Sequence, residues 1–359
     1  MAFDTVIDKA QFETALTASA NAIREKTGRA DSIEWLADKG FADAIGAIAV
    51  GGGGSDGEWF NDGDTHIWIT LQEGRTSPKL GVCPKGTVTV DWGDGTEPDV
   101  LTGTSTSTVK WTPTHNYFNP GDYIITLRVD GSVYLSGSTT NNQYAYLLRH
   151  VSGSNAINKV YLNSITKVEI GNGITSIHNS AFNYCTSLTS VKIPDSVTSI
   201  GQNAFQYCYS LASIDIPDSV TSIGQNAFSD CHSLTSVIIP DRVMDLYNYA
   251  LSNCYALTSV TIGGSVASIG TDAFRSCTSL ASIIILGSLR TIYKSAFYNC
   301  SGVRYFDFTR HTTVPTLNDT NAFSGVAEDY EIRVPAALYD EWIAATNWST
   351  YASQIVAVQ

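Results

Sequence analysis

Charged residues are scarce in this sequence. Only 15% of the 359 residues are Asp, Glu, Lys or Arg, and 34 acidic residues against 21 basic ones give a formal net charge of −13. No cluster of Lys and Arg occurs, whereas proteins that bind nucleic acid or an anionic membrane surface need such clusters. We therefore expect no nucleic-acid partner.

Long apolar runs are also lacking. No stretch approaches the roughly 18 apolar residues of a transmembrane helix, so we expect no membrane insertion. Residues 1–8 contain neither a basic segment nor an apolar core. We therefore expect no secretory signal.

The common motifs of catalysis are missing as well. The chain contains no glycine-rich phosphate loop, no His-Glu-x-x-His and no Gly-x-Ser-x-Gly. Its 6 His are scattered without a common spacing. We predict that the protein is not an enzyme and uses no cofactor.

Cysteine follows a regular spacing. Of the 7 Cys, the last six are each separated by 23 residues, namely Cys185, Cys208, Cys231, Cys254, Cys277 and Cys300. Disulfide frameworks and zinc sites have paired, unequal spacings, so an equal interval indicates one Cys per structural repeat. A column of small buried side chains is favoured over a redox or metal array, because no repeat places His or Asp at ligand spacing from its Cys.

The 23-residue repeat predicts a solenoid over residues 151–308. Leu-x-x-Val-x-Ile is typical of a short strand, Pro-Asp or Gly-Gly then turns the chain, and Val-x-x-Ile-Gly-x-x-Ala-Phe-x-x-Cys forms a second wall. No repeat can bury its apolar face alone, so neighbours must stack. The unit L-x-S-V-x-I-P-x-S-V-T-S-I-G-x-x-A-F-x-x-C, over about residues 160–325, resembles the BspA-type leucine-rich repeat. This resemblance implies an adhesin or binding protein of host-associated bacteria or their phages.

Residues 58–150 alternate as an all-β region. Residues 90–96 (Val-Asp-Trp-Gly-Asp-Gly-Thr) and 114–123 are similar to the two marks of a PKD-type, immunoglobulin-like β-sandwich. Asp91, Asp94, Glu97 and Asp99 are a weak calcium candidate. The favoured alternative is turn geometry with solvated carboxylates.

The two ends of the chain differ from the middle. Residues 1–48 carry a narrow apolar helical stripe, Phe12, Leu16, Ala20 and Ile23, which another surface must cover. The alternative is a frayed arm. Residues 49–57 are a Gly-rich linker. Residues 309–359 should form an α/β cap with Trp342 and Trp348 in its core. The expected fold is thus mainly β, with a helical arm, a PKD-type sandwich, a repeat solenoid and a cap.

Binding should use positions that vary while the repeat stays fixed. We expect one row of strand positions, spaced by 23, to be exposed: Glu169, Lys192, Asp215, Ile238, Thr261, Ile284 and Asp307. A second row flanks the Cys column and is rich in Tyr, Asn and His, which suit sugars or protein surfaces. The candidate ligand-binding residues are Tyr184, Tyr207, Tyr209, His232, Tyr247, Tyr249, Tyr255, Lys192 and Asp215. The alternative is a merely solvated face.

The leading hypothesis is a phage tail-associated receptor-binding protein. The segment ALTASANAIREKTG…KGFADAIGAI resembles N-terminal segments of phage tail and minor structural proteins. This implies attachment to tail or baseplate proteins, a location in the virion and a possible homotrimer. An adhesin-type module without an export signal fits a virion that leaves the cell by lysis. The alternatives are a bacterial cell-surface adhesin and a purely structural tail component.

Overall fold

The computed structural model describes residues 59–60, 62–72, 78–104, 110–112, 115–135, 148–149, 163–287 and 289–359. All of them belong to one compact unit, Gly57–Gln359. The predicted arm 1–48 and linker 49–57 lie outside the described residues. Within the described part of the chain, no helix is long and apolar enough to span a membrane.

The first part of this unit is an antiparallel β region. Strand β2 is its centre and pairs with β3, β4, β5 and β6, while β5 also pairs with β1. Alternate residues, such as Ile67, Ile69, Val88 and Val90, are fully or almost fully buried, which is the period of two expected of strands with one core face. The strands are β1 (Thr65–Leu71), β2 (Lys79–Asp91), β3 (Asp99–Thr104), β4 (Lys110–Trp111), β5 (Gly121–Leu135) and β6 (Leu148–Arg149).

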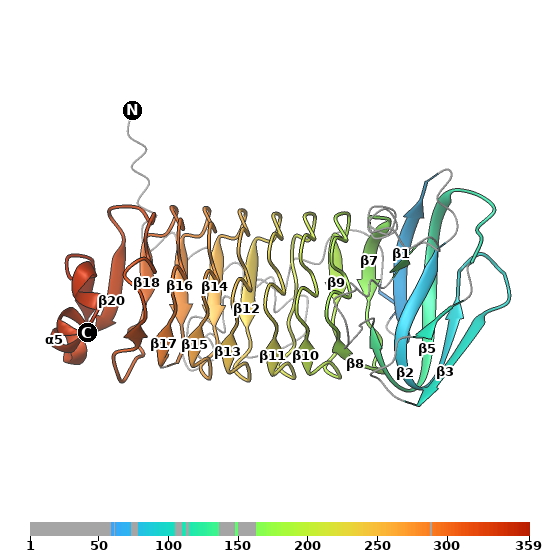
Figure 1. Ribbon diagram of the computed structural model, residues 1–359, viewed down its shortest axis with the longest axis horizontal. Coiled ribbons are helices and arrows are strands. Elements are labelled where there is room, and N and C mark those ends of the chain that lie inside the picture. Colours follow the sequence, from blue (N-terminus) through green and yellow to red (C-terminus); the bar gives the residue numbers. More distant parts are fainter. Residues whose placement is uncertain are drawn as a thin grey trace, which may run out of the picture. The chain divides into compact units, whose positions relative to one another are not determined.

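The second part is a solenoid with two walls of parallel strands, and we call each repeat a coil (Figure 1). Wall A contains β8 (Ile174–Ile177), β10 (Ser199–Ile200), β11 (Ser222–Ile223), β13 (Asp245–Leu246), β15 (Ser268–Ile269), β17 (Thr291–Ile292) and β19 (Thr316–Leu317). Wall B contains β7 (Ile165–Glu169), β9 (Ser190–Lys192), β12 (Ser236–Ile239), β14 (Ser259–Ile262), β16 (Ser282–Ile285), β18 (Tyr305–Asp307) and β20 (Glu331–Pro335). The prediction of a mainly β chain with stacked repeats is therefore confirmed.

Equivalent residues of successive coils lie in register. Ser199 pairs with Ser222, and Ser236 with Ser259, so the 23-residue period of the sequence is the period of the stack. The last coil is longer, because Thr291 pairs with Thr316 and Tyr305 with Glu331. Both walls thus continue past residue 308, where the sequence placed the start of the cap.

The six regularly spaced Cys form an internal column. All six are free and fully buried. From Cys208 onward, each thiol donates to a carbonyl oxygen of the preceding coil at 3.0–3.3 Å, for example Cys208 Sγ to Phe182 O. Burial raises the pKa of the thiols of Cys185, Cys208, Cys231, Cys254 and Cys300. The column is a packing and hydrogen-bonding element of the core.

Both walls continue into the β region. On wall B, β7 pairs antiparallel with β1, with His66 opposite Glu169 and Trp68 opposite Lys167. On wall A, β8 pairs in parallel with β5. The β region therefore closes the first coil by strand pairing (Figure 1), as the ends of a stack of repeats require.

The other end of the solenoid is closed by a small α/β cap. It contains the 3-10 helix η1 (Ala336–Leu338), α5 (Tyr339–Ala344), η2 (Trp348–Tyr351) and β21 (Ile355–Val358), which pairs with β20. Trp342 and Trp348 are fully buried, and the Trp342 ring lies 5.1 Å from that of Phe308. Trp348 Nε1 donates to Pro315 O at 2.7 Å. The interpretation of both indoles as core residues is confirmed.

Candidate functional site

Five of the candidate residues form one continuous row of ring contacts, which we call the aromatic row: Tyr184, Tyr207, Tyr209, His232 and Tyr255. Successive ring centroids lie 4.3, 6.1, 4.6 and 4.8 Å apart. The rings come from four consecutive coils and follow the side of the solenoid that leads from wall A back to wall B. The repeat thus brings together side chains up to 71 residues apart (255 − 184).

Two members of the row adopt an unusual backbone conformation. Tyr184 and Tyr207 have φ values of 64° and 63°. The equivalent positions of later coils, also left-handed, hold Asp230, Asn253, Ser276 and Asn299. Small polar residues tolerate this conformation, but a bulky residue pays about 1–2 kcal/mol for it. Two tyrosines therefore occupy positions that the backbone assigns to small residues.

The rings of the row cover each other's faces. Tyr184 stacks on Tyr207, and Tyr209 stacks on His232. Tyr209 and Tyr255 are exposed, so the row offers solvent mainly ring edges and hydroxyl groups. Desolvation and neighbouring Tyr184 raise the pKa of Tyr207 to about 12, which keeps its hydroxyl protonated at neutral pH. Such an edge can donate and accept hydrogen bonds and contact apolar groups at modest entropic cost.

Asp230 adds a carboxylate beside the row. It accepts hydrogen bonds from Ser229 Oγ at 2.7 Å and from Asn253 Nδ2 at 3.0 Å, and lies 3.8 Å from His232 Nε2. The row therefore combines hydroxyl groups, an imidazole and a carboxylate on one surface, which suits a polar ligand such as a glycan or a hydrophilic protein surface.

The remaining candidates lie elsewhere. Tyr247 directly follows β13 on wall A and is 50% exposed, and Tyr249 has a φ of 58°. Neither has a ring contact with the aromatic row. Asp215 lies on the wall B side between β9 and β12, where desolvation and the charges of Asp218 and Asp195 raise its pKa. Lys192 lies in β9, the second strand of wall B, which pairs with β7.

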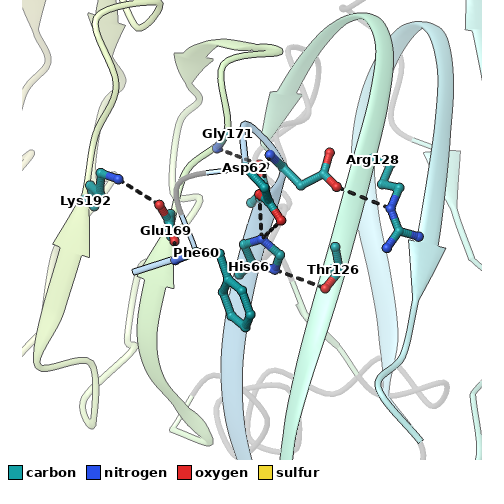
Figure 2. A network of polar contacts seen from close by, with 10 residues as sticks. Phe60, Asp62, His66, Thr126, Arg128, Glu169, Gly171 and Lys192 are labelled. Carbon is teal, nitrogen blue, oxygen red and sulfur yellow. Dashed lines mark hydrogen bonds and ion pairs between the residues drawn. The ribbon is translucent and has the colours of Figure 1, made fainter. Parts of the chain in front are cut away.

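The strand row predicted to be exposed is exposed only in part. Glu169 and Thr261 are buried, whereas Ile238 is exposed. Glu169 is covered because Phe60 N donates to its Oε2 at 2.8 Å and Lys192 Nζ to its Oε1 at 2.7 Å (Figure 2). Lys192 thus neutralises a buried carboxylate, which is a structural role.

The same region is fixed by a second set of polar contacts. His66 is buried, with Nε2 3.0 Å from Asp62 Oδ1 and Nδ1 3.0 Å from Thr126 Oγ1 (Figure 2). Arg128 pairs with Asp64 at 3.2 Å. The segment that enters β1 is thereby attached to both β5 and the first coil.

The weak calcium candidates have other partners in the structure. Asp91 accepts from Gly93 N, Asp94 accepts from Thr96 and lies 2.9 Å from His115 Nε2, and Asp99 accepts from Trp92 Nε1 at 2.9 Å. These contacts hold the turn after β2. Among the described residues, no group of three or more His, Cys, Asp or Glu is placed to hold a metal ion.

One exposed aromatic residue of wall A was not among the predicted site residues. Tyr293 is 39% exposed and occupies the same repeat position as Tyr247. The signal was present in the sequence, because both residues replace the Gly of Ser-Ile-Gly.

The repeat region matches a known family. Residues 155–240 and 198–328 match the BspA type leucine rich repeat region, in 6 copies. The repeat part of this chain is therefore a BspA-type leucine-rich-repeat region. No curated protein matches the chain.

Solved structures of leucine-rich-repeat proteins are similar to parts of the chain. A T. pallidum protein is 24% identical, with 52% of this chain and 82% of that chain covered and a TM-score of 0.39. A protein from Eubacterium ventriosum is 22% identical (55% and 48% covered, TM-score 0.41), and the pneumococcal vaccine antigen PcpA is 16% identical (63% and 48% covered, TM-score 0.37). This chain thus spans about half the length of the last two.

Proposed function

We propose that this chain, whose repeats are of the BspA type, is a non-enzymatic receptor-binding protein that recognises a bacterial surface glycan or protein through the aromatic row. One observation carries this proposal. Tyr184 and Tyr207 hold a left-handed backbone at positions where Asn253 and Asn299 serve the same coil geometry. The fold does not need tyrosine there, so the presence of tyrosine on this strained backbone is best explained by a ligand.

We place this receptor-binding protein on a phage tail. The support is the resemblance of residues 1–48 to segments of phage tail and minor structural proteins. That segment would attach to tail or baseplate proteins, with a homotrimer as one arrangement. The pairing of β1 with β7 and of β5 with β8 would then make the β region a rigid spacer rather than a free one.

A bacterial cell-surface adhesin is the second candidate. The match of residues 155–328 to BspA-type repeats favours it. Detection of the chain in purified virions would support the tail protein, whereas detection on the surface of the producing cell would support the adhesin. A structural tail component without a ligand is the third candidate.

The test is binding of the labelled full chain to a panel of intact bacteria. The row variant carries Tyr207→Asn, Tyr209→Thr and Tyr255→Thr. Each new residue is the one that another coil has at the same position, namely Asn253, Thr186 and Thr278. The control is Phe118→Ser, since Phe118 is 94% exposed in the β region.

We expect strain-selective binding that the row variant loses and the control keeps. Equal binding by the row variant would refute recognition through the row. Binding to no strain by folded protein would favour the structural tail component.

A further inference from the structure

Wall A carries a second group of exposed aromatic residues. Along the outer face, Asp245, Ser268 and Thr291 pair in register in β13, β15 and β17. The residues two positions further along the chain lie on the same face, and they are Tyr247, Gly270 and Tyr293. Successive coils therefore present tyrosine, glycine and tyrosine beside a row of polar side chains.

Glycine at this position has a structural reason. A Cβ on Gly201, Gly224 or Gly270 would lie 2.5–2.7 Å from backbone atoms of the preceding coil. Tyr247 departs from this rule, and β11 and β13 share one register pair where the neighbouring strand pairs share two. Tyr293 departs from it as well, and β15 and β17 share two register pairs, so the stack admits a tyrosine here without losing its register.

The two tyrosines are not core residues. Tyr247 is 50% exposed and Tyr293 is 39% exposed. Gly224 and Gly270 precede and follow Tyr247 in the stack and have no side chain that could cover its ring. In the aromatic row, by contrast, neighbouring rings cover each other. Wall A therefore offers exposed tyrosines that are not stacked on one another, unlike those of the aromatic row.

Polar groups adjoin these exposed tyrosines. Ser268 Oγ donates to Asp245 Oδ1, and Thr291 is the next residue in register. Gly270 is buried at the floor between the two tyrosines, whereas Gly201 and Gly224 are half-buried. An apolar C–H face on an aromatic ring, with hydroxyl groups directed to a carboxylate and hydroxyls, is how a protein recognises a saccharide.

We propose that Tyr247, Gly270 and Tyr293, with Asp245, form a carbohydrate-binding site that is separate from the aromatic row. Two coil spacings place the tyrosines about 9.6 Å apart along the wall. Directly linked pyranose rings lie about half this distance apart, so the two tyrosines would contact the first and third of three linked rings. The ligand is therefore an oligosaccharide rather than a single sugar.

The experiment uses the full chain on an array of bacterial and host oligosaccharides. The mono-, di- and tetrasaccharide of the best-bound sugar are then titrated by calorimetry. The site variant is Tyr247→Gly with Tyr293→Gly, which restores the glycine of Gly224 and Gly270, and a melting curve checks its fold. Tyr247→Phe is the matched control, because it keeps the ring.

We expect the site variant to bind the tetrasaccharide at least about tenfold more weakly, and Tyr247→Phe to stay within about threefold of the unaltered chain. The monosaccharide should bind about tenfold more weakly than the tetrasaccharide. Binding of no oligosaccharide, unchanged affinity in the site variant, or equal affinity for mono- and tetrasaccharide would each overturn the proposal. The row variant should leave this affinity unchanged, so failure of the proposed function and failure of this site are distinguishable.

Discussion

Acid should weaken the C-terminal end of the solenoid through His311. This side chain is 3% exposed, and its Nε2 accepts a hydrogen bond from Leu289 N at 3.1 Å. An accepting Nε2 belongs to the neutral imidazole. Protonation would turn this acceptor into a donor facing another donor. Desolvation lowers the pKa of His311 from 6.5 to about 4.

The sign of the effect follows from the lowered pKa. The unfolded chain binds a proton at His311 below about pH 6.5, whereas the folded chain does so only near pH 4. The stability contribution of the neutral ring is complete above pH 6.5 and is lost as the pH falls from 6.5 toward 4. Between pH 7.5 and 5.0 the linkage relation gives a loss of about 2 kcal/mol in the free energy of unfolding.

Urea unfolding followed by tryptophan fluorescence measures this loss, because the Trp342 ring lies 6.1 Å from that of His311. His178 also has a pKa lowered by desolvation, so the comparison with a variant is essential. His311→Gln keeps an acceptor for Leu289 N but does not titrate. It should lose about 2 kcal/mol less than the unaltered chain over this pH range. An identical pH dependence in the two proteins would refute the reasoning.

Lys192→Ala should lower the free energy of unfolding by about 3 kcal/mol, because it leaves the buried Glu169 carboxylate without its cation. Glu169→Ala should cost clearly less, because the partly exposed Lys192 ammonium can turn to water and only Phe60 N loses its acceptor; equal losses in urea unfolding would contradict this. Tyr207→Asn should change the free energy of unfolding by no more than about 1 kcal/mol, because asparagine lowers the cost of the left-handed backbone and this gain offsets the lost ring contact. A loss above about 2 kcal/mol in the same assay would identify Tyr207 as a core residue. In native protein at pH 8, the six column thiols should resist a disulfide reagent and react only after denaturation; rapid labelling of Cys254 would contradict its burial.

The solenoid could be predicted because the period of a sequence repeat determines the length of a coil and the stacking of its strands. The equal spacing of Cys185 and its successors fixes both the length of a coil and the register of its strands, and burial of Phe205 and Phe228 follows from the same period. The end of the stack was harder to place. Thr291 pairs with Thr316, 25 residues on (316 − 291), so the last coil leaves the period while the walls continue.

The junction with the β region carried no such signal. Glu169 occupies a strand position that the 23-residue period marks as outward, but β1 lies beside β7 and brings Phe60 onto it. These two residues are 109 apart in the sequence. Periodicity describes contacts between like coils, and the first coil has an unlike neighbour. A long-range contact of this kind has no local pattern from which it could be inferred.

In a solenoid, other coils show the same backbone position with a different residue. This comparison supports the choice of the two candidate surfaces. Asn253 and Asn299 adopt the backbone of Tyr207, and Gly224 and Gly270 hold the position of Tyr247, so the same coil is seen with and without each tyrosine. The cost of a bulky side chain at these positions can then be separated from any need of the fold. Tyr209 and Tyr255 break no backbone rule, and only their exposure and ring contacts identify them. Tyrosines that the coil does not require, such as Tyr207 and Tyr247, are therefore the residues at which the two proposed binding sites can be tested without removing a contact that the fold needs.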